Sequence, residues 1–238
     1  MALCIAEPGG TACLCCSGPG TIGRRAALCV TGGLLAATVF AAGVPRAQST
    51  LTPDAALKAL MDGNQRFVAK QLASFKEDLD VLKQNTVAKQ EPFAAVLSCA
   101  DSRVPVELIF DQSIGHVFVT RVAGNVASAE IIASLEYGAA VLGTKTILVL
   151  AHSGCGAVKA ALEGKAVPGQ ISTLYRLIRP AIDRAGGDLT VAEKANAMVQ
   201  AALLRDASPV LAEMVKQGTL SVAAGYYDLG TGRVTLLS

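Results

Sequence analysis

The chain is poor in several features that would define a protein class directly. Its 238 residues include no tryptophan, only two histidines, no internal repeat and no low-complexity tract. Beyond residue 29 there are only two cysteines, at positions 99 and 155, which leaves at most one possible disulfide in that part of the chain. These absences favour an ordinary globular domain over a repeat architecture or a disulfide framework.

The chain also lacks an excess of positive charge once residues 1–47 are set aside. That segment holds three arginines, one acidic residue and no lysine, and the remaining 191 residues carry 18 basic and 18 acidic side chains. A balanced charge provides no basic stripe to hold phosphate groups, so we expect no nucleic-acid partner. A segment of 191 residues is long enough to form one domain with a substantial core.

Residues 1–47 have the composition of an export leader. The pair Arg24-Arg25 precedes a nearly uncharged apolar stretch over residues 26–44, and small residues follow near Arg46. This order is typical of a signal peptide, and the paired arginines are typical of the twin-arginine export machinery. The stretch is about long enough to span a bilayer, but its many Ala and Gly residues favour a cleaved leader over an anchor. We predict a periplasmic or otherwise exported domain over 48–238.

Apolar runs alternate with helical patterns along residues 48–238. This alternation predicts a mostly parallel sheet with helices on its faces. A Gly-Thr-Gly turn at 230–232 between two apolar stretches predicts a terminal hairpin. We therefore expect an α/β fold: a central, mostly parallel sheet flanked by helices, with an antiparallel edge strand near the C-terminus. The predicted strands are 93–98, 116–121, 146–151, 221–227 and 233–237. Two of the predicted helices begin at residues 52 and 154. The others cover 74–88, 105–110, 128–142, 170–185 and 190–217, the last of which is interrupted at 208–209.

Two short polar clusters follow two of the apolar runs. One holds Cys99, Asp101 and Arg103, and the other holds His152 and Cys155. The carboxyl ends of parallel strands meet at one edge of a sheet, where open α/β sheets bind ligands. Two thiols, one imidazole and one carboxylate are an ordinary ligand set for tetrahedral zinc. We predict one Zn²⁺ bound by Cys99, His152 and Cys155, with water or Asp101 in the fourth position.

Other interpretations of these clusters remain open from the residues alone. Two cysteines in an exported chain could form a disulfide, although the neighbouring His152 and Asp101 favour a metal. The 53-residue gap between Cys99 and His152 is too long for a zinc finger. A buried structural zinc is a further alternative. The pairing of Asp101 with Arg103 argues against it, because a structural site has no use for a carboxylate beside a cation.

The two motifs together resemble those of the β-class carbonic anhydrases. The resemblance rests on residues 99–105 (CADSRVP) and 152–156 (HSGCG), extends through 121–125 (RVAGN) and the helix at 129–142, and covers roughly residues 54–238. It implies a zinc lyase that interconverts carbon dioxide and bicarbonate, and a homodimer or higher even oligomer. By position it implies that Cys99, His152 and Cys155 are zinc ligands and that Asp101 and Arg103 form a carboxylate–guanidinium pair.

The resemblance also suggests catalytic roles. Zinc lowers the pKa of bound water and so provides zinc-bound hydroxide, with activity expected to rise toward mildly alkaline pH. Asp101 would accept the hydrogen of the hydroxide, and Arg103 would hold Asp101 off the metal. Gln90 matches a glutamine that donates to a substrate oxygen in the family, although a glutamine that simply ends a helix is the alternative. Val96 replaces a tryptophan of a second bicarbonate site, so we expect no inactivation by bicarbonate.

The sequence leaves three rival functions open. The same zinc site could hydrolyse carbon disulfide or carbonyl sulfide, which are also small linear molecules. The chain could be a zinc-binding module without catalysis, against which the intact Asp101 and Arg103 argue. A thiol hydrolase with Cys155 as nucleophile would leave the Cys99 cluster unexplained, because a base three residues away is poorly placed to reach that sulfur.

Overall fold

The computed structural model describes residues 49–74, 83–84 and 86–238. The predicted leader, 1–47, lies outside the described residues, and so does most of the helix predicted at 74–88. In the described part of the chain, no helix combines the length and hydrophobicity that a bilayer crossing requires.

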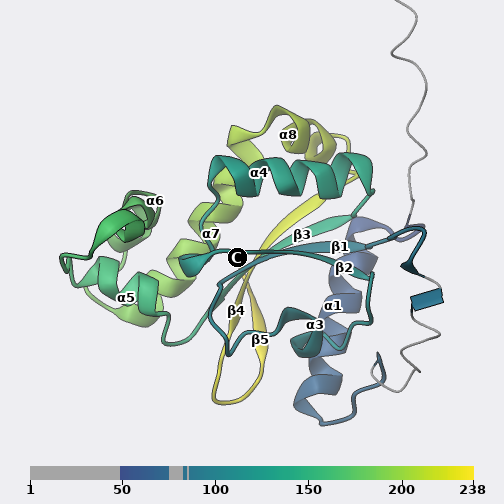
Figure 1. The fold of residues 1–238 in the computed structure, drawn as a ribbon, viewed down its shortest axis with the longest axis horizontal. Coiled ribbons are helices and arrows are strands. Elements are labelled where there is room, and N and C mark those ends of the chain that lie inside the picture. Colours follow the sequence, from purple (N-terminus) through teal and green to yellow (C-terminus); the bar gives the residue numbers. More distant parts are fainter. Residues whose placement is uncertain (1–48, 75–82, 85) are drawn as a thin grey trace, which may run out of the picture. The chain divides into compact units, whose positions relative to one another are not determined.

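A five-stranded sheet in the order β2-β1-β3-β4-β5 forms the centre of the described unit (Figure 1). The first four strands run parallel, and β5 pairs antiparallel with β4, as the sequence predicted. Register places Ser98 beside Arg121 on one side and beside Leu150 on the other, so β1, β2 and β3 end at one edge. The strands are β1 (Ala94–Ser98), β2 (Val117–Arg121), β3 (Thr146–His152), β4 (Ser221–Tyr227) and β5 (Val234–Leu237).

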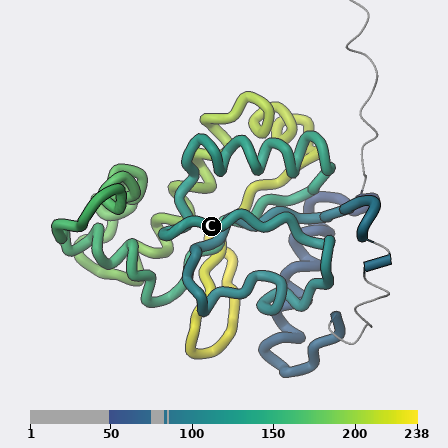
Figure 2. Tube along the Cα trace, in the orientation of Figure 1, coloured from purple at the N-terminus to yellow at the C-terminus, as the bar shows by residue number. Residues whose placement is uncertain are grey.

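Helices cover both faces of this sheet. One face packs against α4 (Ala129–Glu136), α7 (Leu189–Ala207) and α8 (Pro209–Lys216), and the other against α1 (Pro53–Val68) and α3 (Val106–Ile109). All five residues of β1 are buried, as expected for a central parallel strand. The trace in Figure 2 shows the chain leaving β2, passing through α4 and returning to the sheet as β3. In the sheet, β1 lies between β2 and β3.

Local sequence signals set where several helices begin. Thr52 caps α1 by accepting from the amide of Ala55, and Pro53 occupies the first turn. Ser208 separates α7 from α8 and caps α8 through the amide of Leu211, with Pro209 next in the chain. The predicted interruption at 208–209 is confirmed.

The helix predicted at 128–142 differs in its last turn. After α4 the chain continues as a π-helical segment, Tyr137–Val141, in which the amide of Leu142 donates to the carbonyl of Tyr137. Gly138 lies against the ring of Phe118, where an added Cβ would be 3.0 Å from a ring carbon. The wider turn thus brings the helix backbone close to β2, a long-range contact that helical periodicity does not encode.

The remaining helices of the described residues lie beyond the edge at which β1 and β3 end. They are α5 (Gly156–Leu162) and α6 (Ser172–Ile182), the latter preceded by a short 3₁₀ turn, Gly169–Ile171. Together with α7 they enclose a third apolar cluster that contains both Cys99 and Cys155. The edge that carries the polar clusters is therefore covered by an apolar shell.

Candidate metal centre

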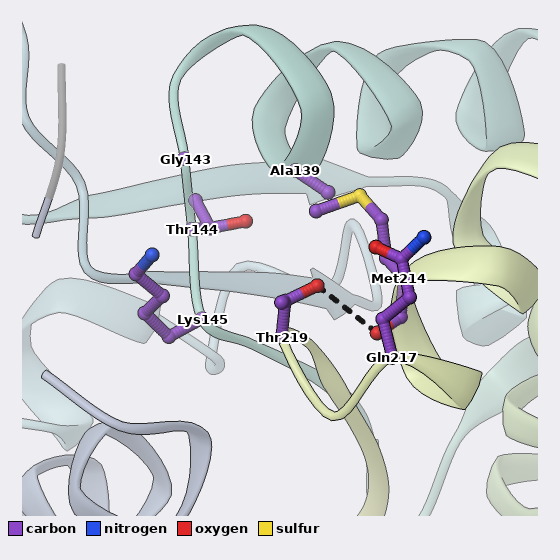
Figure 3. A pocket seen from close by; sticks show the side chains of 7 residues that line it. All are labelled: Ala139, Gly143, Thr144, Lys145, Met214, Gln217 and Thr219. Atoms are coloured by element: carbon purple, nitrogen blue, oxygen red, sulfur yellow. Dashed lines mark hydrogen bonds between the residues drawn. The ribbon is translucent and has the colours of Figure 1, made fainter. Parts of the chain in front are cut away.

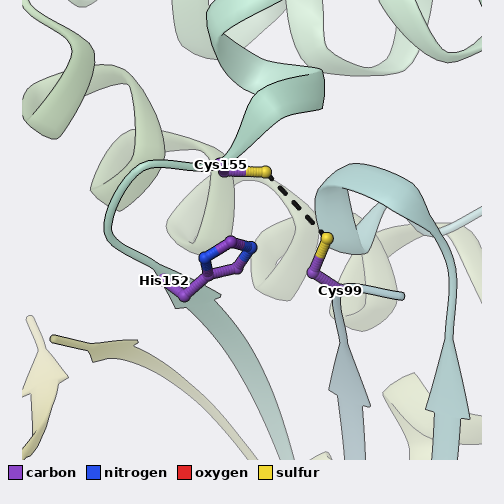
Figure 4. Close-up of side chains that lie close together, drawn as sticks. All are labelled: Cys99, His152 and Cys155. Atoms are coloured by element: carbon purple, nitrogen blue, oxygen red, sulfur yellow. Dashed lines mark hydrogen bonds between the residues drawn. The ribbon is translucent and has the colours of Figure 1, made fainter. Parts of the chain in front are cut away.

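Three side chains that the sequence singled out meet at the carboxyl edge of the sheet (Figure 4). Cys99 follows β1, His152 is the last residue of β3, and Cys155 precedes the first turn of α5. Gly154 has φ of +66°, a conformation that suits glycine, and it turns the chain so that His152 and Cys155 face the same point. Cys99 and His152, 53 positions apart in the sequence, are brought together because β1 and β3 are adjacent strands of one sheet.

The geometry of the three ligand atoms fits one metal ion. The Cys99 and Cys155 sulfurs are 4.0 Å apart, and the ligand atoms of all three residues lie within 4.8 Å of one another. Two sulfurs on one tetrahedral zinc, each about 2.3 Å from it, would be about 3.8 Å apart. All three residues are buried, and neither cysteine forms a disulfide. The group is typical of a zinc site.

The imidazole of His152 presents one nitrogen to this cluster. Its Nδ1 donates to the carbonyl of Ser153 at 3.0 Å, which fixes the ring and leaves Nε2 as the acceptor. Nε2 is buried and has no hydrogen-bond partner among the described residues. A buried acceptor beside two thiols is an expected arrangement for a metal ligand, because the ion would satisfy it.

Electrostatics at the cluster favour a thiolate at Cys99. The two sulfurs share a hydrogen bond, and this contact lowers the pKa of Cys99 and raises that of Cys155. The amide of Gly124 also donates to the Cys99 sulfur, at 3.3 Å. Burial lowers the pKa of His152, but the Cys99 thiolate, the Ser153 carbonyl and Asp101 together raise it by more, so the net direction is upward. A thiolate at Cys99 places negative charge next to His152 and Cys155.

Asp101 and Arg103 form the expected carboxylate–guanidinium pair. The Asp101 oxygens accept from Arg103 Nε at 2.9 Å and from Nη2 at 2.7 Å, and the Arg103 amide adds a third bond of 2.9 Å. The Arg103 guanidinium holds the pKa of Asp101 far below its usual range. Asp101 Oδ2 lies 3.9 Å from His152 Nε2. The carboxylate therefore rests on Arg103, beside the cluster of three ligands.

Arg121 supports the backbone that carries Cys99 and Asp101. Its Nε donates to the Cys99 carbonyl at 2.9 Å, and its Nη2 donates to the Asp101 carbonyl at 2.5 Å. Arg103 Nη2 also donates to the carbonyl of Gly154 at 3.3 Å, which links the two ligand-bearing loops. Two arginines thus hold the rim of the site in place.

The fold does not bring Gln90 to this centre within one chain. Gln90 is exposed, precedes β1, and lines a cavity of about 520 Å³ together with Tyr137, Val141 and Leu142. Leu142 precedes β3, whereas Cys99 and His152 lie at the other end of β1 and β3. Gln90 is therefore at the edge of the sheet opposite to the metal cluster.

A second cavity lies on that same far side of the sheet. It has a volume of about 160 Å³, and Thr144, Lys145 and Thr219 in its wall come just before β3 and β4 (Figure 3). The Thr219 hydroxyl donates to the Met214 carbonyl at 3.1 Å. This cavity contains none of the residues that the sequence singled out.

Sequence reasoning missed three buried polar residues on α7 that contact the Cys155 loop and the loop after β2, which holds Gly124. Glu193 accepts from the Cys155 amide at 2.7 Å, Asn196 donates to the Gly124 carbonyl at 2.8 Å, and Gln200 bonds to Asn196 at 3.2 Å. The available signal was their i, i+3, i+7 spacing in an alanine-rich helix, which places polar side chains on one face.

An open α/β sheet with a Cys-His-Cys cluster at its carboxyl edge defines a class of metal-dependent α/β enzymes. Comparison with known proteins identifies the family within this class. The sequence profile of the carbonic anhydrase family matches residues 94–234. A Mycolicibacterium smegmatis carbonic anhydrase is 39% identical over 196 residues, covering 78% of this chain and 94% of the relative. Carbonic anhydrase 2 of Mycobacterium tuberculosis is 36% identical over 192 residues, covering 77% and 92%.

Solved structures agree with the sequence comparison. The β-carbonic anhydrase CcaA matches with a TM-score of 0.62 and 26% identity, covering 76% of this chain and 87% of that one. The Coccomyxa β-carbonic anhydrase matches with a TM-score of 0.61 and 28% identity, covering 76% and 86%. The chain belongs to the carbonic anhydrase family, in its β class.

Proposed function

We propose that this chain catalyses the reversible hydration of carbon dioxide to bicarbonate and a proton, with one zinc ion bound by Cys99, His152 and Cys155. The observation that carries the proposal is the meeting of this ligand group with the Asp101–Arg103 pair at one sheet edge. When bound, zinc would supply the Lewis acidity that makes water a nucleophile near neutral pH.

Asp101 is the residue that would orient the attacking water. Its carboxylate lies beside His152 and is kept ionised by Arg103, so it is available to accept a hydrogen bond. A carboxylate that accepts a hydrogen bond from this water turns a lone pair of the water oxygen toward carbon dioxide. Arg103 would keep Asp101 in this position through its two bonds, so that Asp101 leaves the fourth ligand position open.

The test is a paired measurement on the purified protein. Metal analysis should give about one zinc per chain, and stopped-flow assays should show rapid hydration of carbon dioxide. Zinc without hydration would indicate a zinc-binding module, and hydration without zinc would contradict the metal assignment. Carbon disulfide and carbonyl sulfide, assayed in parallel, would identify the rival substrates if either is turned over faster.

Gln90 could take part in the reaction only from a second copy of the chain. In its own chain it lies at the opposite edge of the sheet, whereas the expected homodimer could bring it near the partner's metal centre. Sedimentation of the purified protein tests the oligomeric state. A stable, fully active monomer would contradict the role of Gln90.

Export to the periplasm remains part of the proposal. It is supported by the Arg24-Arg25 pair and the apolar stretch at 26–44. Cell fractionation followed by N-terminal sequencing should find a product that begins near residue 48. Replacement of both arginines by lysine should retain the precursor in the cytoplasm.

A further inference from the structure

We propose that Glu193, Asn196 and Gln200, here named the α7 polar stripe, are positioning residues for the two sulfur ligands. The inference rests on the proposed zinc site, because it concerns how the fold holds Cys99 and Cys155. The stripe makes no contact with substrate in this account. It acts through two backbone groups, the Cys155 amide and the Gly124 peptide, whose amide donates to the Cys99 sulfur.

The three side chains share one face of α7 and are almost fully buried. Their relative exposures are 1%, 0% and 0%. The same helix has buried alanines at 192, 195, 197 and 201, which let its backbone approach the sheet closely. A buried polar side chain destabilises the fold unless its hydrogen bonds are satisfied, so the partners of these three residues indicate what they are for.

Glu193 holds the loop of the second sulfur. Its Oε1 accepts from the Cys155 amide at 2.7 Å, and its Oε2 accepts from the Tyr226 hydroxyl at 3.2 Å. The first bond is short and joins a carboxylate to the backbone of the ligand residue itself. Because Tyr226 lies on β4, the contact ties the Cys155 loop to both α7 and the sheet.

Asn196 acts on the first sulfur through Gly124, which lies in the loop after β2. Its Nδ2 donates to the Gly124 carbonyl at 2.8 Å, and the Gly124 amide donates to the Cys99 sulfur at 3.3 Å. Gly124 has φ of +76°, so this loop depends on an unusual backbone conformation that outside contacts must stabilise. Asn196 therefore fixes the peptide group that donates to Cys99.

Gln200 fixes Asn196 and the far end of the same loop. Its Nε2 donates to Asn196 Oδ1 at 3.2 Å and to the Leu177 carbonyl at 2.9 Å, while its Oε1 accepts from the Ala127 amide at 2.9 Å. Both atoms of the amide are thus used, which determines how the Asn196 amide is oriented. One helix face consequently contacts the Cys155 loop directly and the Cys99 sulfur indirectly, through the loop after β2.

A positioning role predicts a loss of metal affinity beyond any loss of stability. Changes to groups that orient metal ligands typically reduce metal affinity or activity by about 10- to 100-fold. We expect Glu193→Ala and Asn196→Ala each to raise the zinc dissociation constant within this range. Glu193→Gln should lose less, because its amide oxygen can still accept from the Cys155 amide, and Tyr226→Phe should lose least.

The experiment compares these variants with Leu204→Ala, which is the matched control. Leu204 is fully buried on the same helix but belongs to the apolar cluster on the face of the sheet, away from both sulfurs. Zinc affinity is measured by chelator competition, thermal unfolding is measured on the metal-free proteins, and the cobalt-substituted proteins are compared by their thiolate absorption bands. Leu204→Ala should lower the melting temperature and change the zinc dissociation constant by less than about twofold.

Unchanged zinc affinity in Glu193→Ala and Asn196→Ala would overturn the inference, and so would an affinity loss in Leu204→Ala of the same size. If the alanine variants do not fold, Asn196→Asp replaces them and should show the full loss of zinc affinity, because its carboxylate cannot donate to the Gly124 carbonyl; Glu193→Gln should then show the smaller loss. Zinc binding by the unaltered protein without hydration of carbon dioxide would contradict the proposed function but not the positioning role. Absence of zinc binding in the unaltered protein would contradict both.

Discussion

At the scale of single residues, the metal centre depends on which partner each polar atom already has. His152 uses Nδ1 on a neighbouring carbonyl and keeps Nε2 for the cluster, whereas Asp101 uses both oxygens on Arg103. The two side chains lie within 3.9 Å of each other, yet only His152 is left with an unpaired buried acceptor. This difference fits the proposed roles, His152 as a metal ligand and Asp101 as the residue that orients water.

The first prediction concerns Asp101 and Arg103. Asp101→Ala should lower kcat/KM for carbon dioxide hydration by about 10²- to 10³-fold, because a positioned acceptor contributes on that order. The zinc content should stay at the level of the unaltered protein. Arg103→Lys should give an intermediate loss, since an ammonium group cannot make the bidentate contact.

Asp62→Ala is the matched control for this measurement. Asp62 is an exposed carboxylate on α1 that pairs with Lys58, and its replacement should leave kcat/KM unchanged. Full turnover by Asp101→Ala would contradict the role given to Asp101. Loss of zinc from that variant would instead identify Asp101 as a metal ligand.

At the scale of elements, the sequence predicted most of what positions the site. The buried runs of β1 and β3, each followed by polar residues, placed Cys99, His152 and Cys155 at one sheet edge, and the structure confirms this. The sequence did not predict that Glu193 would contact the Cys155 loop, or that Asn196 would contact Gly124 in the loop after β2. Such contacts span 38 and 72 residues, and no local pattern specifies which loop a buried polar side chain will meet.

Asp111 is another long-range element contact that local patterns did not predict. It follows α3 with φ of +46°, is fully buried, and accepts from Arg66 Nε on α1 at 2.5 Å. Its oxygens also accept from the amides of Ala73 and Ser74 at 3.0 Å. The carboxylate thus joins α1, the segment after it and the end of α3.

The second prediction is that Asp111 makes stability depend on pH. Burial raises the pKa of Asp111, but Arg66 and the amides of Ser74 and Ala73 together lower it by more, so the folded-state pKa lies below the unfolded value of about 3.9. This contribution is present above about pH 4 and is lost as the pH falls through the folded-state pKa. Asp111→Asn should therefore lower the free energy of unfolding at pH 7 by about 2 kcal/mol.

Urea unfolding of both proteins between pH 2.5 and 7 checks this prediction. The difference between them should shrink below about pH 4, because the unaltered protein loses the charge that the variant never had. Asparagine tolerates positive φ about as well as aspartate, so backbone strain does not explain the result. A difference that stays constant with pH would show that the charge of Asp111 contributes nothing.

At the scale of the whole molecule, the metal centre exists only when the sheet is assembled. Cys99 and His152 are 53 residues apart in the sequence, and the stripe that supports the loops lies a further 41 to 48 residues along the chain. β1, β3, α5 and α7 must all be in place before the three ligand atoms meet. Zinc should therefore bind the folded chain far more tightly than the unfolded one.

The third prediction follows from this coupling between folding and metal binding. A ligand that binds only the folded state stabilises it by about 2.7 kcal/mol when its free concentration is 100 times its dissociation constant. Adding zinc to the metal-free protein should raise the melting temperature, and a chelator should reverse the shift. Cys99→Ser and Cys155→Ser should abolish most of it, whereas Asp101→Ala should retain it, because Asp101 rests on Arg103. Equal shifts in the unaltered protein and both cysteine variants would mean that zinc binds elsewhere, and the Cys-His-Cys centre would then have no role in holding the fold together.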